Sequence, residues 1–192
     1  MRGILIAFGL AVVAVMMIAA FPHIQVDDGK ILVTDGKIQF EVPGYRYYML
    51  YVTAYNTETL VAELMVFNAT GCITPTNMTS ATNPAPYVVT ANNSYEGDAN
   101  WRKWYAFDSF TNTSPIGDIG WNAQTTVPTW IKIDLGANYT ATSYQIWKTF
   151  NVGCPRSWSL QGSVDDVNWV VLDGKTNIES WTINTAVTYD LE

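Results

Sequence analysis

The sequence predicts an all-β protein, and three observations support this fold class. From residue 43 onward, short runs rich in Val, Ile, Tyr, Trp and Thr alternate with clusters of Pro, Gly, Asn and Asp. Helical periodicity is nearly absent from the same part of the chain. Aromatic residues make up 14% of the 192 residues, and two layers of antiparallel sheet bury that many alternating aromatic side chains most economically. We therefore expect a β-sandwich.

The first 42 residues differ from the rest and form a separate attachment segment in our interpretation, with the β-sandwich over 43–192. Residues 3–21 are almost wholly apolar, and as a helix they would span about 28 Å, enough for a membrane or export segment. The same region also resembles a later one, because ILIAFGLAVVAV (4–15) matches ILVTDGKIQFEV (31–42) at Ile, Leu, Gly and Val. The second copy predicts a strand, so strand and membrane helix both stay open for the first.

The expected strands of the main region follow in order. The segment 45–55 (YRYYMLYVTAY) is dense in aromatic residues, and 60–67 (LVAELMVF) is a short apolar run. A turn of helix is expected over 101–107. Segment 128–136 (PTWIKIDLG) begins after a proline, and its Asp-Leu-Gly end predicts a turn in which glycine takes a positive φ.

Three further strands complete the expected set. They are ATSYQIWKTF (141–150), SWSLQGS (157–163) and NWVVLDG (168–174). Gly162 to Asp166 form a loop before the strand that Trp169 opens.

The composition excludes several classes of function. Ten Lys and Arg against 17 Asp and Glu give a net charge of −7, and no basic run offers a surface for nucleic acid. The single histidine, His23, excludes most His-based triads and His-ligated zinc sites. Asp165 and Asp166 are adjacent and therefore point in different directions, unlike the carboxylate pair of a hydrolase. We expect no enzymatic activity.

Three segments in order resemble the discoidin domain, also called the coagulation-factor C-type or galactose-binding-like domain. They are YAFDSFTNTSPIGDIGWNAQ (105–124), WIKIDLGANYTATSYQIW (130–147) and PRSWSLQGSVDDVNWVVLD (155–173). The resemblance covers residues 84–181 and implies a jelly-roll β-sandwich. A fourth segment, 45–67, resembles the one that usually closes such a domain, so either the sandwich is permuted or this segment supplies flanking strands.

The resemblance implies a glycan site in the loops at one end, over residues 90–101, 109–124 and 148–158. Aromatic rings there would stack on a neutral sugar, while amides and a cation would bond its hydroxyls. The candidates are Tyr95, Trp104, Trp121, Asn122, Phe150, Asn151 and Arg156. For Trp121 and Arg156 a packing role stays equally open, since the matching family positions often pack.

The resemblance also implies a calcium site. Family members often hold one Ca²⁺ with loop carbonyls, an Asp and a Glu, and the matching residues here are Asp108 and Glu63. Ser109 stands where the family has glycine, and the alternative is that Asp108 caps a turn while Glu63 is a solvated strand residue. For Cys72 and Cys154, a disulfide and a reduced pair both stay open.

The order of segments resembles tailed-bacteriophage virion proteins that carry discoidin-like modules. We therefore expect a non-catalytic, homo-oligomeric virion component that contacts other virion proteins through its N-terminal segment and host glycans through the sandwich. The alternatives are a purely structural virion protein without a glycan ligand, and a membrane-anchored or secreted adhesin. The fold alone hosts many ligands and does not choose among them.

Overall fold

In the computed structural model the described residues are 31–34, 37–40, 44–95, 97, 101–109, 120–148 and 153–191. The chain divides into two units, Met1–Pro43 and Gly44–Glu192. Every regular element of the described residues is a strand except η1 (Lys103–Phe107), a short 3₁₀ helix, which confirms the all-β prediction. Within the same ranges, no helix is long and apolar enough to cross a membrane. The apolar run 3–21, with its two interpretations, lies outside them.

The first unit contains an antiparallel pair, β1 (Ile31–Thr34) and β2 (Lys37–Phe40), in which Thr34 is opposite Lys37. The expectation of one strand over 31–42 is therefore wrong. Asp35 and Gly36 between the two strands are the dipeptide that favours a two-residue hairpin loop, and this signal divides the run.

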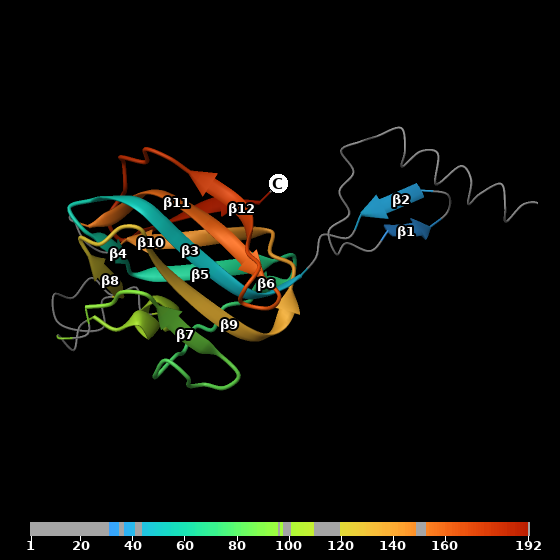
Figure 1. Ribbon diagram of the computed structural model, residues 1–192, viewed down its shortest axis with the longest axis horizontal. Coiled ribbons are helices and arrows are strands. Elements are labelled where there is room, and N and C mark those ends of the chain that lie inside the picture. The colour runs from blue at the N-terminus through green and yellow to red at the C-terminus, as the bar shows by residue number, and fades with distance from the viewer. Residues whose placement is uncertain are drawn as a thin grey trace, which may run out of the picture. The chain divides into compact units, whose positions relative to one another are not determined.

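The second unit is built on a five-stranded antiparallel sheet (Figure 1). From edge to edge its strands are β12 (Val170–Lys175), β11 (Cys154–Ser163), β3 (Tyr45–Asn56), β9 (Thr129–Tyr139) and β7 (Val88–Ala91). Long β3 lies at the centre and pairs with β9 on one side and β11 on the other. The expected strands 45–55, 157–163 and 168–174 all lie in this sheet, whereas β7 was not expected.

A four-stranded antiparallel sheet carries most of the remaining strands. In order they are β13 (Thr185–Asp190), β10 (Ser143–Lys148), β5 (Glu63–Asn68) and β6 (Gly71–Cys72). A separate pair joins β4 (Thr59–Val61) to β8 (Trp121–Gln124). The single strand expected over 60–67 is therefore wrong, because the chain changes partner at Ala62, whose amide donates instead to the carbonyl of Trp147 at 3.1 Å.

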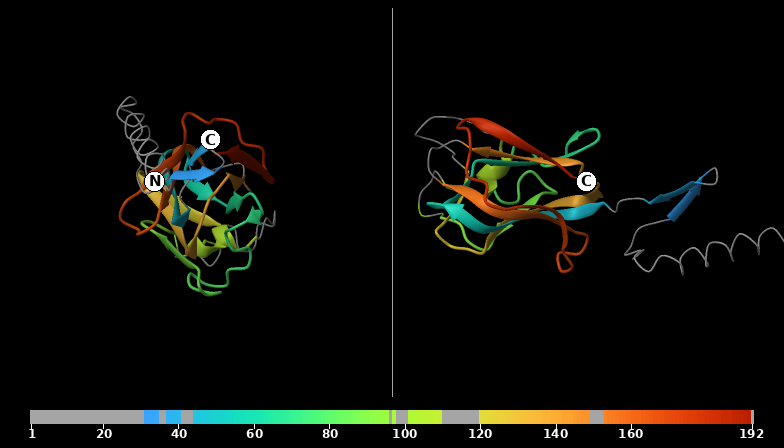
Figure 2. Two further views of the ribbon diagram at one scale, coloured as in Figure 1. Left: turned by 90° about the vertical axis from the view of Figure 1, so that its right-hand side faces the viewer. Right: turned by 90° about the horizontal axis from the view of Figure 1, so that it is seen from above.

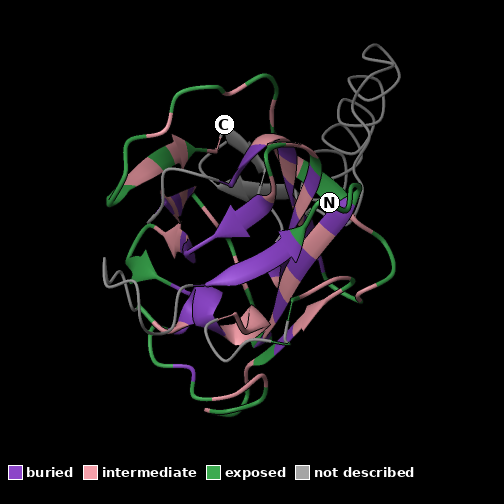
Figure 3. Ribbon diagram, turned by 90° about the vertical axis from the view of Figure 1, so that its left-hand side faces the viewer, coloured by how far each residue is buried: buried purple, intermediate pink, exposed green. Residues whose placement is uncertain are grey.

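Side chains from both large sheets meet in one hydrophobic cluster. Figure 2 shows the two sheets from two further directions, and Figure 3 shows buried residues following their central strands. Tyr48 and Leu50 from β3, Ile131 from β9 and Ile146 from β10 are at most 1% exposed. The alternation of buried and outer residues along β3 and β9 leaves a second set of side chains on the far face of the five-stranded sheet.

Strand β9 continues past the expected Asp-Leu-Gly turn to Tyr139. Gly136 does take a positive φ of 75°, as expected, and a Cβ added there would lie only 2.6 Å from side-chain atoms of Pro86. The register with β3 shifts at this point, since Tyr45 faces Tyr139 while Tyr47 faces Asp134. The glycine therefore forms an irregularity within the strand instead of ending it.

Candidate functional site

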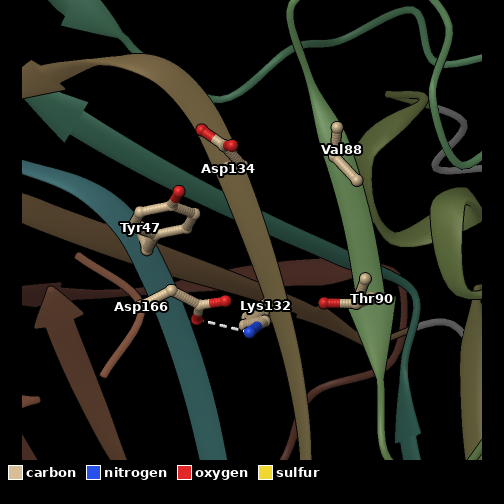
Figure 4. Close-up of a pocket in the computed structure, with 6 residues that line it drawn as sticks. All are labelled: Tyr47, Val88, Thr90, Lys132, Asp134 and Asp166. Atoms are coloured by element: carbon tan, nitrogen blue, oxygen red, sulfur yellow. Dashed lines mark hydrogen bonds and ion pairs between the residues drawn. The ribbon is translucent and has the colours of Figure 1, made fainter. Parts of the chain in front are cut away.

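A pocket of about 190 Å³ lies on the outer face of the five-stranded sheet (Figure 4). Three strands and one loop line it: Tyr47 from β3, Lys132 and Asp134 from β9, Val88 and Thr90 from β7, and Asp166 from the loop before β12.

The alternation of β9 creates the base of this pocket. Ile131, Ile133 and Leu135 are at most 1% exposed and enter the core, so Lys132 and Asp134 project from the opposite face. The register then brings the neighbours together. Tyr47 and Val88 are the partners of Asp134 on the two sides, and Thr90 is the partner of Lys132.

The ammonium of Lys132 lies near one carboxylate and two aromatic rings. Its ammonium forms an ion pair with Asp166. It also lies 5.3 Å from the ring centre of Trp130 and 5.8 Å from that of Trp169, within the range of cation–π attraction. Two indoles therefore lie next to the lysine of the pocket.

Asp134 is fixed by three donors. Arg46 donates from Nε and Nη2 to the two carboxylate oxygens at 2.7 Å each, and the amide of Gly136 donates to Oδ1 at 2.7 Å. Burial alone raises the pKa of Asp134, but the donors outweigh it, so its pKa lies below the usual value. Burial, and then the negative charge of Asp134, raise the pKa of Tyr47, which therefore keeps its proton at neutral pH.

The carboxylate of Asp165 stabilises the loop that carries Asp166 by accepting hydrogen bonds within it. Asp165 accepts hydrogen bonds from the amides of Asn168 and Val167 at 2.8 and 2.9 Å and from the amide side chain of Asn168 at 2.7 Å. These bonds hold the pKa of Asp165 far below its usual value. Asp166 itself takes a positive φ of 64°, a region that residues other than glycine rarely adopt.

The Thr90 hydroxyl contributes a polar group without a matching partner. Its oxygen is buried and makes no hydrogen bond among the described residues. Figure 4 shows it on the side of Thr90 that faces Lys132. An unsatisfied buried hydroxyl costs about 1–3 kcal/mol.

Two of the residues predicted as ligand contacts are committed to the interior. Trp121 is completely buried, and its indole donates to the carbonyl of Asn93 at 2.8 Å. Asn122 is 4% exposed and donates to Glu58 at 3.0 Å. Both side chains make contacts that hold β8 in place, which is the packing role left open for Trp121.

The other predicted contacts are placed differently. Tyr95 is 41% exposed, whereas Trp104 is half-buried and packs against the core and the ring of Tyr105. Arg156 forms an ion pair with the exposed Glu179. Phe150 and Asn151 lie outside the described residues, so the structure describes only part of the predicted loop site.

The two residues predicted to bind calcium come from adjoining elements. Glu63 begins β5 and is 1% exposed, so it is not a solvated strand residue. Asp108 follows η1 directly, and η1 packs against β5. Within the described ranges, no three His, Cys, Asp or Glu side chains gather as a metal cluster, so these ranges alone do not complete a ligand set.

Both cysteines are free thiols, which is the reduced alternative. Cys72 is exposed on β6, while Cys154 is 3% exposed at the start of β11. Burial raises the pKa of Cys154, although the nearby Lys148 opposes part of the increase.

The sheet-face pocket was not predicted from the sequence. One signal pointed to it: in 129–135 the residues Trp130, Lys132 and Asp134 alternate with apolar ones and so share a face. The partners from β3, β7 and the loop at 163–168 depend on strand register, which the pattern of a single strand does not contain.

Comparison with family models, with curated proteins and with solved structures finds no match to the chain.

Proposed function

We propose that the chain is a non-catalytic glycan-binding protein and that its second unit is a discoidin-like β-sandwich of jelly-roll type. The support for this fold is the order of the sequence segments together with two large antiparallel sheets that share one hydrophobic cluster. The ligand site that we propose is the pocket on the sheet face, in addition to the loop end implied by the resemblance.

The observation that carries this proposal is the composition of the pocket wall. A phenol, two ion-paired carboxylates, an ammonium, a threonine and a valine line a small space, and two indoles lie beside its lysine. A sugar ring presents apolar C–H faces and a rim of hydroxyls, and this mixture of aromatic and polar groups matches both.

The charges of the pocket favour a neutral sugar over an acidic one. Lys132, the cation of its wall, is already paired with Asp166, and Arg46 is paired with the pocket residue Asp134. An anionic ligand would have to displace one of these carboxylates, and the net charge of −7 would repel it at long range.

We place the protein on a bacteriophage particle as a homo-oligomer, with the first unit as its attachment to other virion proteins. Support comes from the segment order of the sequence and from the β1–β2 hairpin, which follows the apolar run in the sequence. A structural virion role without a glycan ligand is the alternative that the following experiment separates from glycan binding.

The test is a glycan array probed with the full chain and with two matched variants. Val88→Phe adds bulk at a pocket wall where the side chain is 37% exposed. Val171→Phe makes the same change on the opposite edge strand of the same sheet, where the side chain is 60% exposed. We expect the wild type and Val171→Phe to bind neutral glycans and Val88→Phe to lose at least tenfold in affinity.

Two further arms separate the proposed sites. Tyr95→Ala removes the exposed aromatic side chain of the loop end, and loss of binding in this variant but not in Val88→Phe would move the site there. Repeating the array with calcium and with a chelator tests whether Asp108 and Glu63 support binding through a metal. If the wild type binds no neutral glycan under either condition, the glycan-binding proposal is wrong and the structural role replaces it.

A further inference from the structure

The outer face of the five-stranded sheet extends beyond the pocket as three successive cross-strand pairs. On β3 and β9 these are Tyr47 with Asp134, Met49 with Lys132, and Tyr51 with Trp130. All three share one face, since residues between them such as Leu50 and Ile131 enter the core. The pocket occupies one end of this row, and an aromatic pair forms the other.

The row is longer than one sugar ring. From Tyr47 to Tyr51 the strand advances by four residues, which at about 3.3 Å per residue is about 13 Å. Tyr51 and Trp130 are both half-buried, so their rings remain partly open to solvent. This aromatic pair therefore follows the Met49–Lys132 pair, whose lysine lines the pocket.

Polar side chains border the row on the side of β11. Ser159 is opposite Tyr51 and Gln161 is opposite Met49, and the Gln161 amide donates to the Ser159 hydroxyl at 2.8 Å. On the other side, Thr90 adjoins Lys132. A central row of aromatic, aliphatic and charged groups, with a hydroxyl and an amide along the β11 border, suits a chain of hydroxylated rings.

We infer that this face binds an oligosaccharide of at least two neutral sugar rings that runs along β3 and β9. One ring occupies the pocket between Tyr47, Thr90 and Lys132. The next ring lies on the rings of Tyr51 and Trp130, where stacking of its C–H face adds affinity. This inference rests on the proposed function and names the ligand length and direction for the same site.

The test measures dissociation constants by titration calorimetry for the full chain with neutral mono-, di- and trisaccharides of glucose, galactose and mannose. In the series that binds, we expect the trisaccharide to bind at least tenfold more tightly than the monosaccharide. Trp130→Ala and Tyr51→Ala should each lower the affinity for the trisaccharide at least tenfold and the affinity for the monosaccharide much less. Val171→Phe is the control, and thermal melts check that each variant is folded.

The outcomes distinguish the two proposals. Equal affinity for one ring and three, or equal losses for both ligands in Trp130→Ala and Tyr51→Ala, would overturn the extended site while the glycan-binding function stands. No binding of any of these saccharides, together with an array without neutral hits, would overturn the function itself.

Discussion

Arg46 holds Asp134 across the β3–β9 pair through two hydrogen bonds of 2.7 Å, one from Nε and one from Nη2. The guanidinium also lies 5.2 Å from the ring centre of Tyr47, so one side chain positions two walls of the pocket. Because a planar fork makes these two bonds, lysine is not an equivalent replacement.

Arg46→Lys is therefore expected to weaken glycan binding with little loss of stability. The Arg46 side chain is 43% exposed, so solvent screens the pair and its contribution to the free energy of unfolding is small. Binding should weaken about three- to tenfold, because Asp134 loses its fixed orientation. Urea unfolding and calorimetry measure the two effects. If the free energy of unfolding changed by several kcal/mol while binding stayed intact, a positioning role for Arg46 would be contradicted.

Acid is expected to destabilise the second unit. The folded pKa of Asp134 lies below its ordinary 3.8, so its ionised form stabilises the fold above that pH, and this stabilisation is lost as pH falls below it. The pKa of Asp165 is lowered in the same direction by its bonds to the loop amides. Urea unfolding at about pH 7, 4 and 2.5 should show most of the loss below pH 4. Asp165→Asn should reduce the dependence on pH, and an unchanged pH profile in this variant would contradict the assignment.

Tyr144→Phe is expected to destabilise the core by about 1–3 kcal/mol. The buried Tyr144 hydroxyl donates to Asp173 at 2.7 Å and accepts from the indole of Trp158 at 2.9 Å. Removal of the hydroxyl leaves a buried indole N–H without its acceptor. Tyr95→Phe is the matched control, because Tyr95 is 41% exposed. Equal stability of the two variants in urea would show that the buried bonds add nothing net.

Gly120→Ala is expected to cost about 3 kcal/mol or more in the free energy of unfolding. The residue has a φ of 128°, and a Cβ there would lie 2.3 Å from the carbonyl oxygen of Val61, a backbone atom that cannot rotate away. Gly174→Ala is the control, because nothing lies within 4 Å of the added carbon. If chemical unfolding gives similar free energies of unfolding for both variants, Gly120 does not approach β4 as closely as described.

The two thiols are expected to react at very different rates. Cys72 is exposed, whereas Cys154 is 3% exposed and has a pKa raised by burial. A thiol reagent such as Ellman's reagent should therefore label one cysteine per native chain and both after unfolding in urea. Cys72→Ser should abolish the native reaction. Absence of any thiol in the unfolded chain would indicate a disulfide instead.

The class of fold was predictable because strand signals are local. Runs such as 45–55 and 157–163 combine β-branched and aromatic residues with bordering turn residues, and each lies within an observed strand. The predicted strand boundaries were wrong where tertiary contacts decide where a strand ends. The run 60–67 is continuous in sequence, yet Ala62 bonds to Trp147, so the chain changes sheets there.

The pocket on the sheet face was less predictable for a related reason. Trp130, Lys132 and Asp134 are visible as one face of a strand, but their neighbours Tyr47 and Val88 come from strands far along the chain. A loop aromatic such as Tyr95 attracts attention in the sequence because it lacks a packing role, whereas strand residues are assumed to support the fold.

The central position of β3 has a consequence for the order of events during synthesis. This strand leaves the ribosome before its partners β9 and β11, which begin about 70 and about 100 residues after it ends. At about 5–20 residues per second, β3 waits on the order of several seconds before its first partner strand has emerged. Pairing over such separations makes folding slow, so the nascent chain exposes an aromatic strand with two open edges until β9 and β11 have emerged.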